Sequence, residues 1–263
     1  MAGPSGRRAY ELNEVSWWSH WTTARWLSPE AYLLTSRDFA EYFFNRGGFL
    51  RVTPGSDGYI EQMEGELEAL GRKPHLFLRS DQLGPGTLAT LQRRGYRIAD
   101  QMAVMECTEL ALKTNPGVRV EEVTAAGGRS REEDWARVYL DSFYGDSGGA
   151  AMAPVVAIVK RLEEVKGASL LLGTVDGGEP VGVTALFRTG KVCGAYCVGT
   201  RRGWRGKRVA STLLAHASST SEGGKLILQT ILSDSLEGFY VKLGFQRAYT
   251  KELFVKDAGN APR

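Results

Sequence analysis

The residues best suited to chemistry in this 263-residue chain form one basic, glycine-bearing stretch, VGTRRGWRGKRVASTLL, at positions 198–214. A strand is expected to end at its first three residues, and a helix is predicted to begin near Gly206. The first turn of a helix carries unpaired N–H groups and the positive end of the helix dipole, so it attracts phosphate. Small residues let a ligand approach the backbone, and basic side chains add charge. The stretch predicts a phosphate or pyrophosphate site, with Gly206 and Ala210 as the small residues and Arg205, Lys207 and Arg208 as the cations, while Val209 lies on the inner face of the helix.

Two common nucleotide motifs are missing from this stretch. It contains neither GxxxxGK[ST] nor GxGxxG, which excludes a Walker A loop and a dinucleotide fingerprint. From the residues alone, two interpretations stay open: an anion site, or a solvated basic helix start. The whole chain has 33 basic and 30 acidic residues, a net charge of +3. That excess is too small to indicate a nucleic-acid partner, so the cluster points to a local anion.

Composition places the protein among ordinary globular chains. Apolar residues make up 43% and charged residues 24%. The three cysteines, Cys107, Cys193 and Cys197, form no CxxC, which argues against a disulfide framework and against a metal site. No apolar run approaches the ~20 residues of a membrane span, and the amino terminus lacks an apolar signal core. We therefore expect a cytoplasmic protein with no membrane partner and no metal; the oligomeric state stays open.

The elements that must position the basic stretch follow a turn-rich joint, KTNPGV, at 113–118. Periodicity after this joint predicts the order β-α-α-β-β-β-α-β-α-β, which makes an α/β fold with a mixed sheet covered by helices. We predict two domains, a first half at 1–112 and a second half at 118–256. In the first half we expect a tryptophan-rich helix over 9–26 and a short helix at 39–44, then strand 47–53, helix 58–70, strand 75–80, helix 85–94 and strand 96–107. In the second half the predicted cofactor helix covers 204–219, followed by strand 225–231, helix 236–243 and strand 246–255.

The two halves share a faint internal repeat. Both contain strand, helix, strand, helix, strand, with LQRRGYR in one and YVKLGFQ in the other. Gly95 lies 17 residues after Leu78, and Gly244 lies 16 residues after Leu228. This predicts two copies of one fold, with the first copy truncated or worn. The alternative is chance recurrence of a common element order.

The second half resembles the Gcn5-related N-acetyltransferases (GNAT). Their cofactor loop reads Gln/Arg-x-x-Gly-x-Gly/Ala, which Arg205, Arg208 and Ala210 match except that Arg208 replaces the usual glycine. A second feature of the family is a helix that ends in the motif L-Y-x-x-L-G-F. The matching residues here are FYVKLGF, at 239–245. Ser233 stands where an asparagine is frequent. The resemblance covers the second half well and the first half only in outline.

This resemblance implies a GNAT-like acyltransferase fold in the second half, a degenerate GNAT-like first half, and acetyl-CoA as the acyl donor. The backbone at Val198, Gly199 and Thr200 would pair with the pantetheine arm, and the turn from Arg205 to Ser211 would hold the pyrophosphate. Ser233 would lie on the cofactor side. Tyr240 would be the general acid, because a phenol with a pKa of ~10 can protonate a thiolate whose thiol has a pKa of ~8.5.

The expected activity is direct acyl transfer from acyl-CoA to an amine on a small molecule or a protein. No carboxylate is identified as the general base; Asp141, Asp146 and Asp234 are only close to the motifs in sequence. Two alternatives stay open: an aminoacyl or long-chain acyl transferase, and a CoA-binding sensor without turnover. The first half has no cationic run before its helix, and Leu91 stands where Tyr240 stands in the second half. We therefore predict that the first half does not bind CoA.

Overall fold

A computed structural model describes the chain over residues 3–53, 55–107, 109–110, 113–124, 131–146, 148–221 and 224–257. The chain forms two compact units. Unit 1 comprises Met1–Met105, Gln229–Glu237 and Arg247–Arg263; unit 2 comprises Glu106–Leu228 and Gly238–Gln246. The first predicted domain ends at residue 112, outside the described residues, so the boundaries 1–112 and 118–256 stay a prediction. Among the described residues, no helix is long and apolar enough to cross a membrane.

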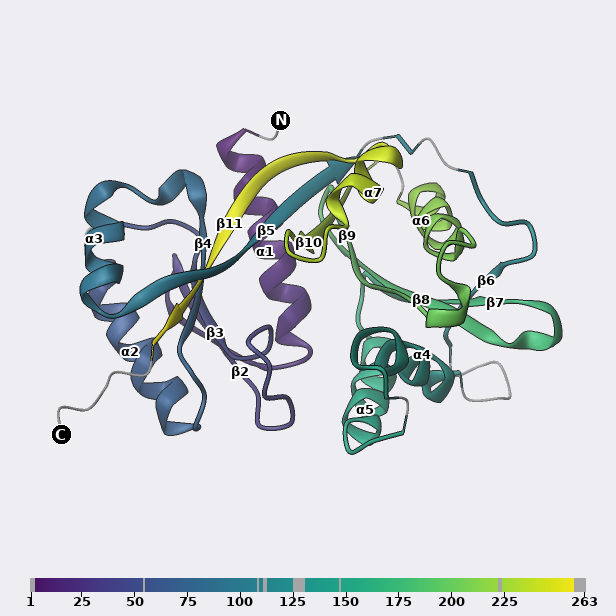
Figure 1. Ribbon diagram of the computed structural model, residues 1–263, viewed down its shortest axis with the longest axis horizontal. Coiled ribbons are helices and arrows are strands. Elements are labelled where there is room, and N and C mark those ends of the chain that lie inside the picture. Colours follow the sequence, from purple (N-terminus) through teal and green to yellow (C-terminus); the bar gives the residue numbers. More distant parts are fainter. Residues whose placement is uncertain are drawn as a thin grey trace. The chain divides into compact units, whose positions relative to one another are not determined.

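Unit 1 is built on a mixed sheet with the strand order β1-β2-β3-β4-β11-β5, followed by the end of β10 (Figure 1). The pairs β1–β2, β2–β3 and β4–β11 are antiparallel, and β3–β4 is parallel. Its helices and strands are α1 (Pro4–Ser19), β1 (Thr23–Ser28), β2 (Ala31–Thr35), β3 (Arg46–Phe49), α2 (Ser56–Ala69), β4 (His75–Arg79), α3 (Pro85–Arg93), β5 (Tyr96–Cys107) and β11 (Gln246–Lys256).

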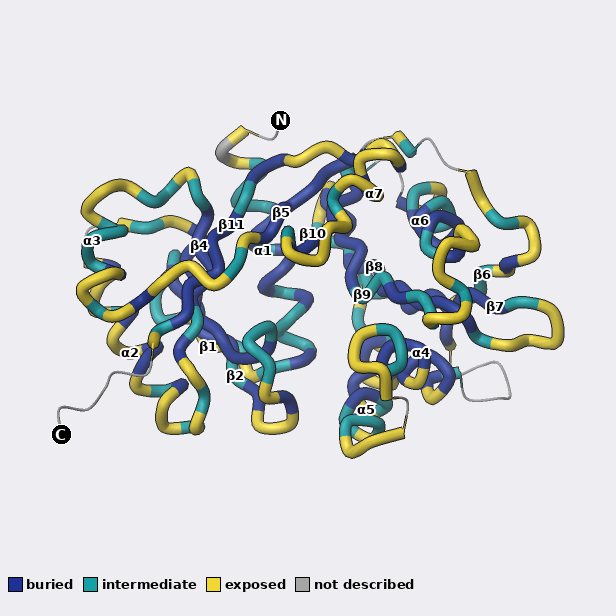
Figure 2. The backbone as a smooth tube through the Cα atoms, in the orientation of Figure 1, coloured by how far each residue is buried: buried dark blue, intermediate teal, exposed yellow. Residues whose placement is uncertain are grey.

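Both faces of this sheet are covered, as the alternation along β2 shows. Successive strand residues point to opposite faces. Leu33 packs with α2 and α3 residues such as Met63 and Leu91, whereas Tyr32 packs with Val15 of α1. The helix α1 and the pair α2 and α3 therefore lie on opposite faces. The strands β2, β3 and β4 between them are buried over most of their length (Figure 2).

Unit 2 has the strand order β10-β9-β8-β7-β6. The strands β6 to β9 are antiparallel, and β9–β10 is parallel. Helix α6 lies on one side of this sheet, and α4 and α5 lie on the other (Figure 1). Its helices and strands are β6 (Arg119–Glu122), α4 (Glu132–Tyr144), α5 (Met152–Leu162), β7 (Ala168–Thr174), β8 (Pro180–Thr189), β9 (Val192–Thr200), α6 (Val209–Thr220), β10 (Lys225–Ile231) and α7 (Glu237–Lys242).

A glycine lets α6 approach the sheet of unit 2. A Cβ added at Gly182 on β8 would lie 2.4 Å from a methyl carbon of Val209 and 3.0 Å from one of Leu213. Both partners are buried side chains of α6. Only a residue without a side chain fits there, so Gly182 fixes where the amino end of α6 sits over the strands.

The element order and register of the two halves match. The series β3-α2-β4-α3-β5 corresponds to β9-α6-β10-α7-β11, and in each series the first two strands are parallel neighbours. The last strands are exchanged: β11 pairs with β4, and β5 neighbours β10. This palindromic order explains why late segments of the sequence complete unit 1.

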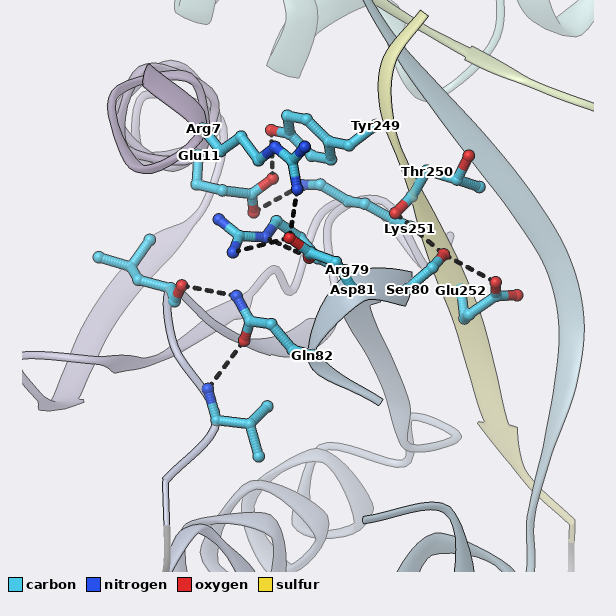
Figure 3. A network of polar contacts seen from close by, with 12 residues as sticks. Arg7, Glu11, Arg79, Ser80, Asp81, Gln82, Tyr249, Thr250, Lys251 and Glu252 are labelled. Atoms are coloured by element: carbon cyan, nitrogen blue, oxygen red, sulfur yellow. Dashed lines mark hydrogen bonds and ion pairs between the residues drawn. The ribbon is translucent and has the colours of Figure 1, made fainter. Parts of the chain in front are cut away.

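Unit 1 buries a group of compensating charges. Lys251 Nζ lies 2.8 Å from Glu11 Oε2 and 2.5 Å from Glu14 Oε2, while Arg46 donates to Glu14 at 2.9 Å. All four side chains are at most 2% exposed. Burial alone would lower the pKa of Lys251, but the two carboxylates raise it, so the ammonium stays charged. The Tyr249 hydroxyl donates to Glu11 at 2.6 Å (Figure 3).

Two predicted helices differ from the structure: one ends earlier than predicted, and the other is a turn. The helix expected over 9–26 ends at Ser19, and Trp26 lies on β1. Just after the end of this helix, the Thr22 hydroxyl donates to the Trp18 carbonyl at 2.8 Å. The helix expected at 39–44 is a turn, because the Asn45 amide donates to the carbonyls of Phe39 and Glu41 and accepts from the backbone N–H of Ser36.

Replacing Lys251 by Met should lower the free energy of unfolding by about 3–5 kcal/mol, because two buried carboxylates lose their shared cation. Urea denaturation measures the loss, which should shrink as the pH is lowered and the carboxylates become protonated. The control is Lys256→Met on the same strand. Lys256 pairs with Glu64 and Glu68 but is 25% exposed, so about 1 kcal/mol or less is expected. Equal losses for the two variants would contradict this account.

Candidate functional site

Strand β9 contains a bulge three residues before its end. Its register with β8 changes between the pairs Val183–Gly199 and Ala185–Tyr196, so β9 has one extra residue there. Cys197, inside the bulge, has a left-handed φ of 54°. Burial raises the pKa of the Cys197 thiol, so the sulfur is protonated and a poor nucleophile.

After the bulge, one edge of β9 has no strand partner. The N–H of Arg201 donates to the carbonyl of Val181 on β8 at 3.0 Å, so the backbone of Arg201 faces β8. Because alternate residues direct their backbone groups to opposite edges, Val198 and Thr200 direct theirs away from β8. On that opposite edge, β10 pairs only with residues 192–194 of β9. The described part of the chain therefore leaves the backbone of Val198 and Thr200 without a strand neighbour.

The basic turn after β9 has two left-handed residues and leads into α6. A short 3-10 helix covers Arg202–Trp204, then Gly206 has φ 77° and Arg208 has φ 59°. The helix α6 begins at Val209 with Arg208 as its N-cap, which corrects the predicted start near Gly206. Within the described residues, no acceptor takes a hydrogen bond from the backbone N–H groups of Gly206, Arg208, Val209, Ala210 or Ser211.

The cations of this turn differ in what they already bind. Arg201 lies 3.4 Å from Asp141 and 3.3 Å from Glu179, so carboxylates neutralise it. Arg205 braces the turn, donating to the carbonyls of Thr200 at 3.4 Å and Ser142 at 3.0 Å.

Two further cations are not neutralised. The Lys207 ammonium lies 4.4 Å from the centre of the Trp204 ring, a cation–π contact. Lys207 and Arg208 are both exposed, and neither forms a salt bridge with a described carboxylate. These two side chains are available to an anion.

Tyr240 lies on α7 and is buried, with 6% of its surface exposed. Its ring meets those of Phe239 and Phe245 edge to face, at 5.2 Å and 5.9 Å between centroids. Its carbonyl accepts from the N–H groups of Leu243 and Phe245, which closes the helix at Gly244, where φ is 100°. Two aromatic rings thus pack against this side chain, and the backbone bonds fix the end of its helix.

Ser233 is the one predicted site residue that belongs to unit 1, while the others and Tyr240 belong to unit 2. Its hydroxyl donates to a carboxylate oxygen of Asp100. The structure thus gives Ser233 a protein partner of its own.

Two residues that sequence patterns missed contact the predicted site. Asn115 of the joint reaches the carbonyl of Lys207 at 2.9 Å. Ser142 of α4 lies so close to Gly199 that an added Cβ there would be 3.0 Å from the serine Cβ. No periodicity signals such contacts, although the turn chemistry of Asn-Pro-Gly marked the joint itself.

The corresponding strand edge in the first half is closed by a side chain. The Gln82 amide donates to the Leu50 carbonyl at 3.0 Å and accepts from the Val52 N–H at 2.8 Å (Figure 3). Gln82 is held in turn beside Asp81, which pairs with Arg79 at 3.0 Å and with Arg7. The side-chain amide of Gln82 thus satisfies the backbone groups of Leu50 and Val52 that an extended ligand would need at this edge.

Sheet register gives the correspondence between the halves. Gly48 pairs with Phe77 in the first half, as Gly194 pairs with Ile227 in the second. The bulge adds one residue to β9 between Gly194 and Gly199, so Val198 corresponds to the segment Arg51–Val52 that follows Gly48. The N–H of Val52 in this segment donates to Gln82, whereas Val198 has an open edge.

Comparison with known proteins agrees with this geometry. Residues 149–258 match the family model described as an acetyltransferase (GNAT) domain. The search of curated proteins found no match. Among solved structures, a GCN5-related N-acetyltransferase from Kribbella flavida is 16% identical with a TM-score of 0.67, covering 97% of this chain and 96% of its own.

Two other solved structures have the same fold at low identity. A GCN5-related N-acetyltransferase from Sphaerobacter thermophilus is 17% identical, with a TM-score of 0.62 over 88% of this chain and 82% of its own. A tandem GNAT protein from the clavulanic acid biosynthesis pathway is 12% identical, with a TM-score of 0.55 over 80% of this chain and 74% of its own. Together with the family-model match, these findings confirm the resemblance seen in the sequence: residues 149–258 match the GNAT acetyltransferase domain, and the chain shares the fold of solved GNAT proteins.

Proposed function

We propose that the second half transfers an acyl group, acetyl in the first instance, from acyl-CoA to an amine. One observation carries the proposal: the open edge of β9 at Val198 and Thr200 leads directly into a turn lined by free N–H groups. An extended amide chain can pair with a strand edge, and phosphates bind at helix amino termini. Acyl-CoA joins these two chemical groups in one molecule.

The residues present fit the donor along its length. The backbone of Val198 and Thr200 would pair with the pantetheine amides, and Gly199 belongs to the same segment. The N–H groups from Gly206 to Ser211 would receive the pyrophosphate, with Lys207 and Arg208 supplying charge. A Cβ added at Gly206 would meet no atom within 4 Å, so this turn is open to a ligand. When bound, acyl-CoA supplies an acyl group activated as a thioester.

We assign Tyr240 as the general acid that gives a proton to the leaving sulfur. Its hydroxyl belongs to a ring that packs edge to face against Phe239 and Phe245. Burial raises the pKa of the Cys197 thiol, which favours direct transfer to the amine over an acyl–cysteine step. We assign no general base: Asp141 is already paired with Arg201. Ser233, hydrogen-bonded to Asp100, is a weaker candidate for the cofactor site.

The acceptor should meet the loop between α4 and α5, from Tyr144 to Met152, of which residue 147 lies outside the described residues. Phe143 and Tyr144 at the end of α4 are 52% and 44% exposed, which is unusual for large aromatic side chains. We propose that this loop, with the first half as a scaffold, selects the amine.

Changing Tyr240 to Phe should lower kcat by about 10²–10⁴-fold while leaving the Kd for acetyl-CoA within about twofold, because only proton transfer is lost. Thiol release with a panel of amines gives kcat, and calorimetry gives Kd. Tyr249→Phe is the control, since it removes another buried hydroxyl that serves Glu11 in unit 1. Unchanged turnover in Tyr240→Phe would remove the acid role. Acetyl-CoA binding without turnover for any amine, already in the unchanged protein, would favour a CoA sensor.

Replacing Lys207 or Arg208 by Ala should raise the Kd for acetyl-CoA by about tenfold each, because a charge-assisted contact to phosphate is lost. The effect should shrink at high salt, where exposed charges are screened. Arg201→Gln is the control in the same turn, and its effect should be smaller because Asp141 and Glu179 already neutralise Arg201. If all three variants weaken binding equally, the cations act only through net charge.

Titration should give one acetyl-CoA per chain. The first half offers no open edge at Val52, because Gln82 already occupies it, and Leu91 replaces the proposed acid. Calorimetry or native mass spectrometry measures the stoichiometry directly. Two bound molecules per chain would overturn the view that the first half has lost this site.

A further inference from the structure

Asn115, in the joint before β6, is tied to the cofactor turn by two hydrogen bonds. Its side-chain Nδ2 donates to the Lys207 carbonyl at 2.9 Å, and its backbone N–H donates to Thr212 Oγ1 at 2.9 Å. The Thr212 hydroxyl in turn donates to the Arg208 carbonyl at 2.8 Å. Two consecutive carbonyls, those of Lys207 and Arg208, are thus held by one short chain of donors.

The held residues include a strained one. Arg208 has φ 59° and ψ 23°, in the left-handed region that only glycine enters without cost. A non-glycine residue stays there only where its surroundings determine the conformation. The Thr212 hydroxyl, in the first turn of α6, holds the Arg208 carbonyl, and Asn115, from outside this turn, holds the carbonyl of Lys207.

The Asn115 side chain is itself fixed in orientation. Its Oδ1 accepts from the N–H of Gly117 at 2.9 Å, which closes a local turn over Pro116. With Oδ1 used in this way, Nδ2 is the atom left to face Lys207. An acceptor at that position could not bind a carbonyl, so the contact requires the amide.

We propose that Asn115 is a positioning residue of the acyl-CoA site, an inference that rests on the proposed function of this turn. By holding the Lys207 carbonyl, Asn115 keeps Arg208 in the left-handed conformation that directs the N–H groups of the turn outward. The protein can then carry an arginine at this position, and with it an extra cation for the phosphates. Asn115 lies outside the matched domain at 149–258, so the joint between the two halves contributes to the site.

The test is a double-mutant cycle between Asn115 and Arg208, read as the calorimetric Kd for acetyl-CoA. Asn115→Ala should raise Kd about fivefold, the size expected for one neutral hydrogen bond, with kcat nearly unchanged. In the Arg208→Gly background the same change should raise Kd less than about twofold, because glycine adopts the left-handed conformation unaided. Equal effects in both backgrounds would overturn the inference.

A matched variant separates the donor from the shape of the side chain. Asn115→Asp keeps the oxygen that receives the Gly117 N–H but loses the donor to Lys207, so Kd should rise at least as much as in Asn115→Ala. Thr114→Asp is the control for the added negative charge, because Thr114 is exposed and adjacent. If Thr114→Asp weakens binding as much as Asn115→Asp, charge alone explains the result and the positioning role fails.

A measurement without cofactor keeps the inference independent of the proposed function. In the cofactor-free protein, backbone amide exchange by NMR at Lys207 and Thr212, whose N–H groups donate to the carbonyls of Trp204 and Arg208, should speed up in Asn115→Ala and return toward its original rate in the double variant with Arg208→Gly. Unchanged exchange in Asn115→Ala would contradict the proposal. No binding of acetyl-CoA by the unchanged protein would defeat the proposed function alone, and these exchange rates would still judge Asn115.

Discussion

The incomplete pairing of β9 is the constraint on which the proposed chemistry depends. This strand pairs with β8 along its length but with β10 only over residues 192–194. The bulge at Cys197 follows three residues after the last pair with β10. A fully paired β9 would offer no backbone groups to an extended ligand. The turn from Arg201 to Arg208 adds a second kind of recognition where the strand ends, so one continuous segment can contact both a chain of amides and a phosphate group.

The two halves show what happens to the same strand arrangement when its edge is closed. Both contain a parallel strand pair joined by a helix, in matching register. In the first half, the link to α2 is short and Gln82 takes the backbone positions of Leu50 and Val52. Buried polar groups of unit 1 instead bind one another within the fold, as in the ion group around Lys251. These differences suit a scaffold in the first half and a catalytic site in the second.

Much of the fold could be predicted from the sequence because strands and helices of the second half have regular apolar periods. The exchange of β5 and β11 could not, since strand partners far apart in sequence leave no periodic signal. Helix α6 begins at Val209, later than the predicted starts at 204 and near Gly206. The sequence pattern predicts helix from Gly206 onward. Arg208 instead adopts a left-handed conformation, so the first helical turn begins after it. Propensity alone does not reveal a strained residue that other parts of the chain hold in place.

The candidate site was predicted in part for the same reason. The residues of the loop are contiguous, so a sequence motif can show them. Asn115, Ser142 and Gln82 act from elsewhere in the chain, and only the three-dimensional contacts show which carbonyl or N–H each one meets. Arg205 looked like a phosphate ligand from its charge, yet it braces two carbonyls of its own turn.

Residue-resolved amide exchange with and without acetyl-CoA tests the central claim most directly, because it reports which strand edge receives the donor. The account predicts that acetyl-CoA slows exchange at Val198, Thr200 and the N–H groups from Gly206 to Ser211, and leaves Val52 unchanged. Protection that appears at Val52 and the start of α2 instead, with none at Val198, would contradict it.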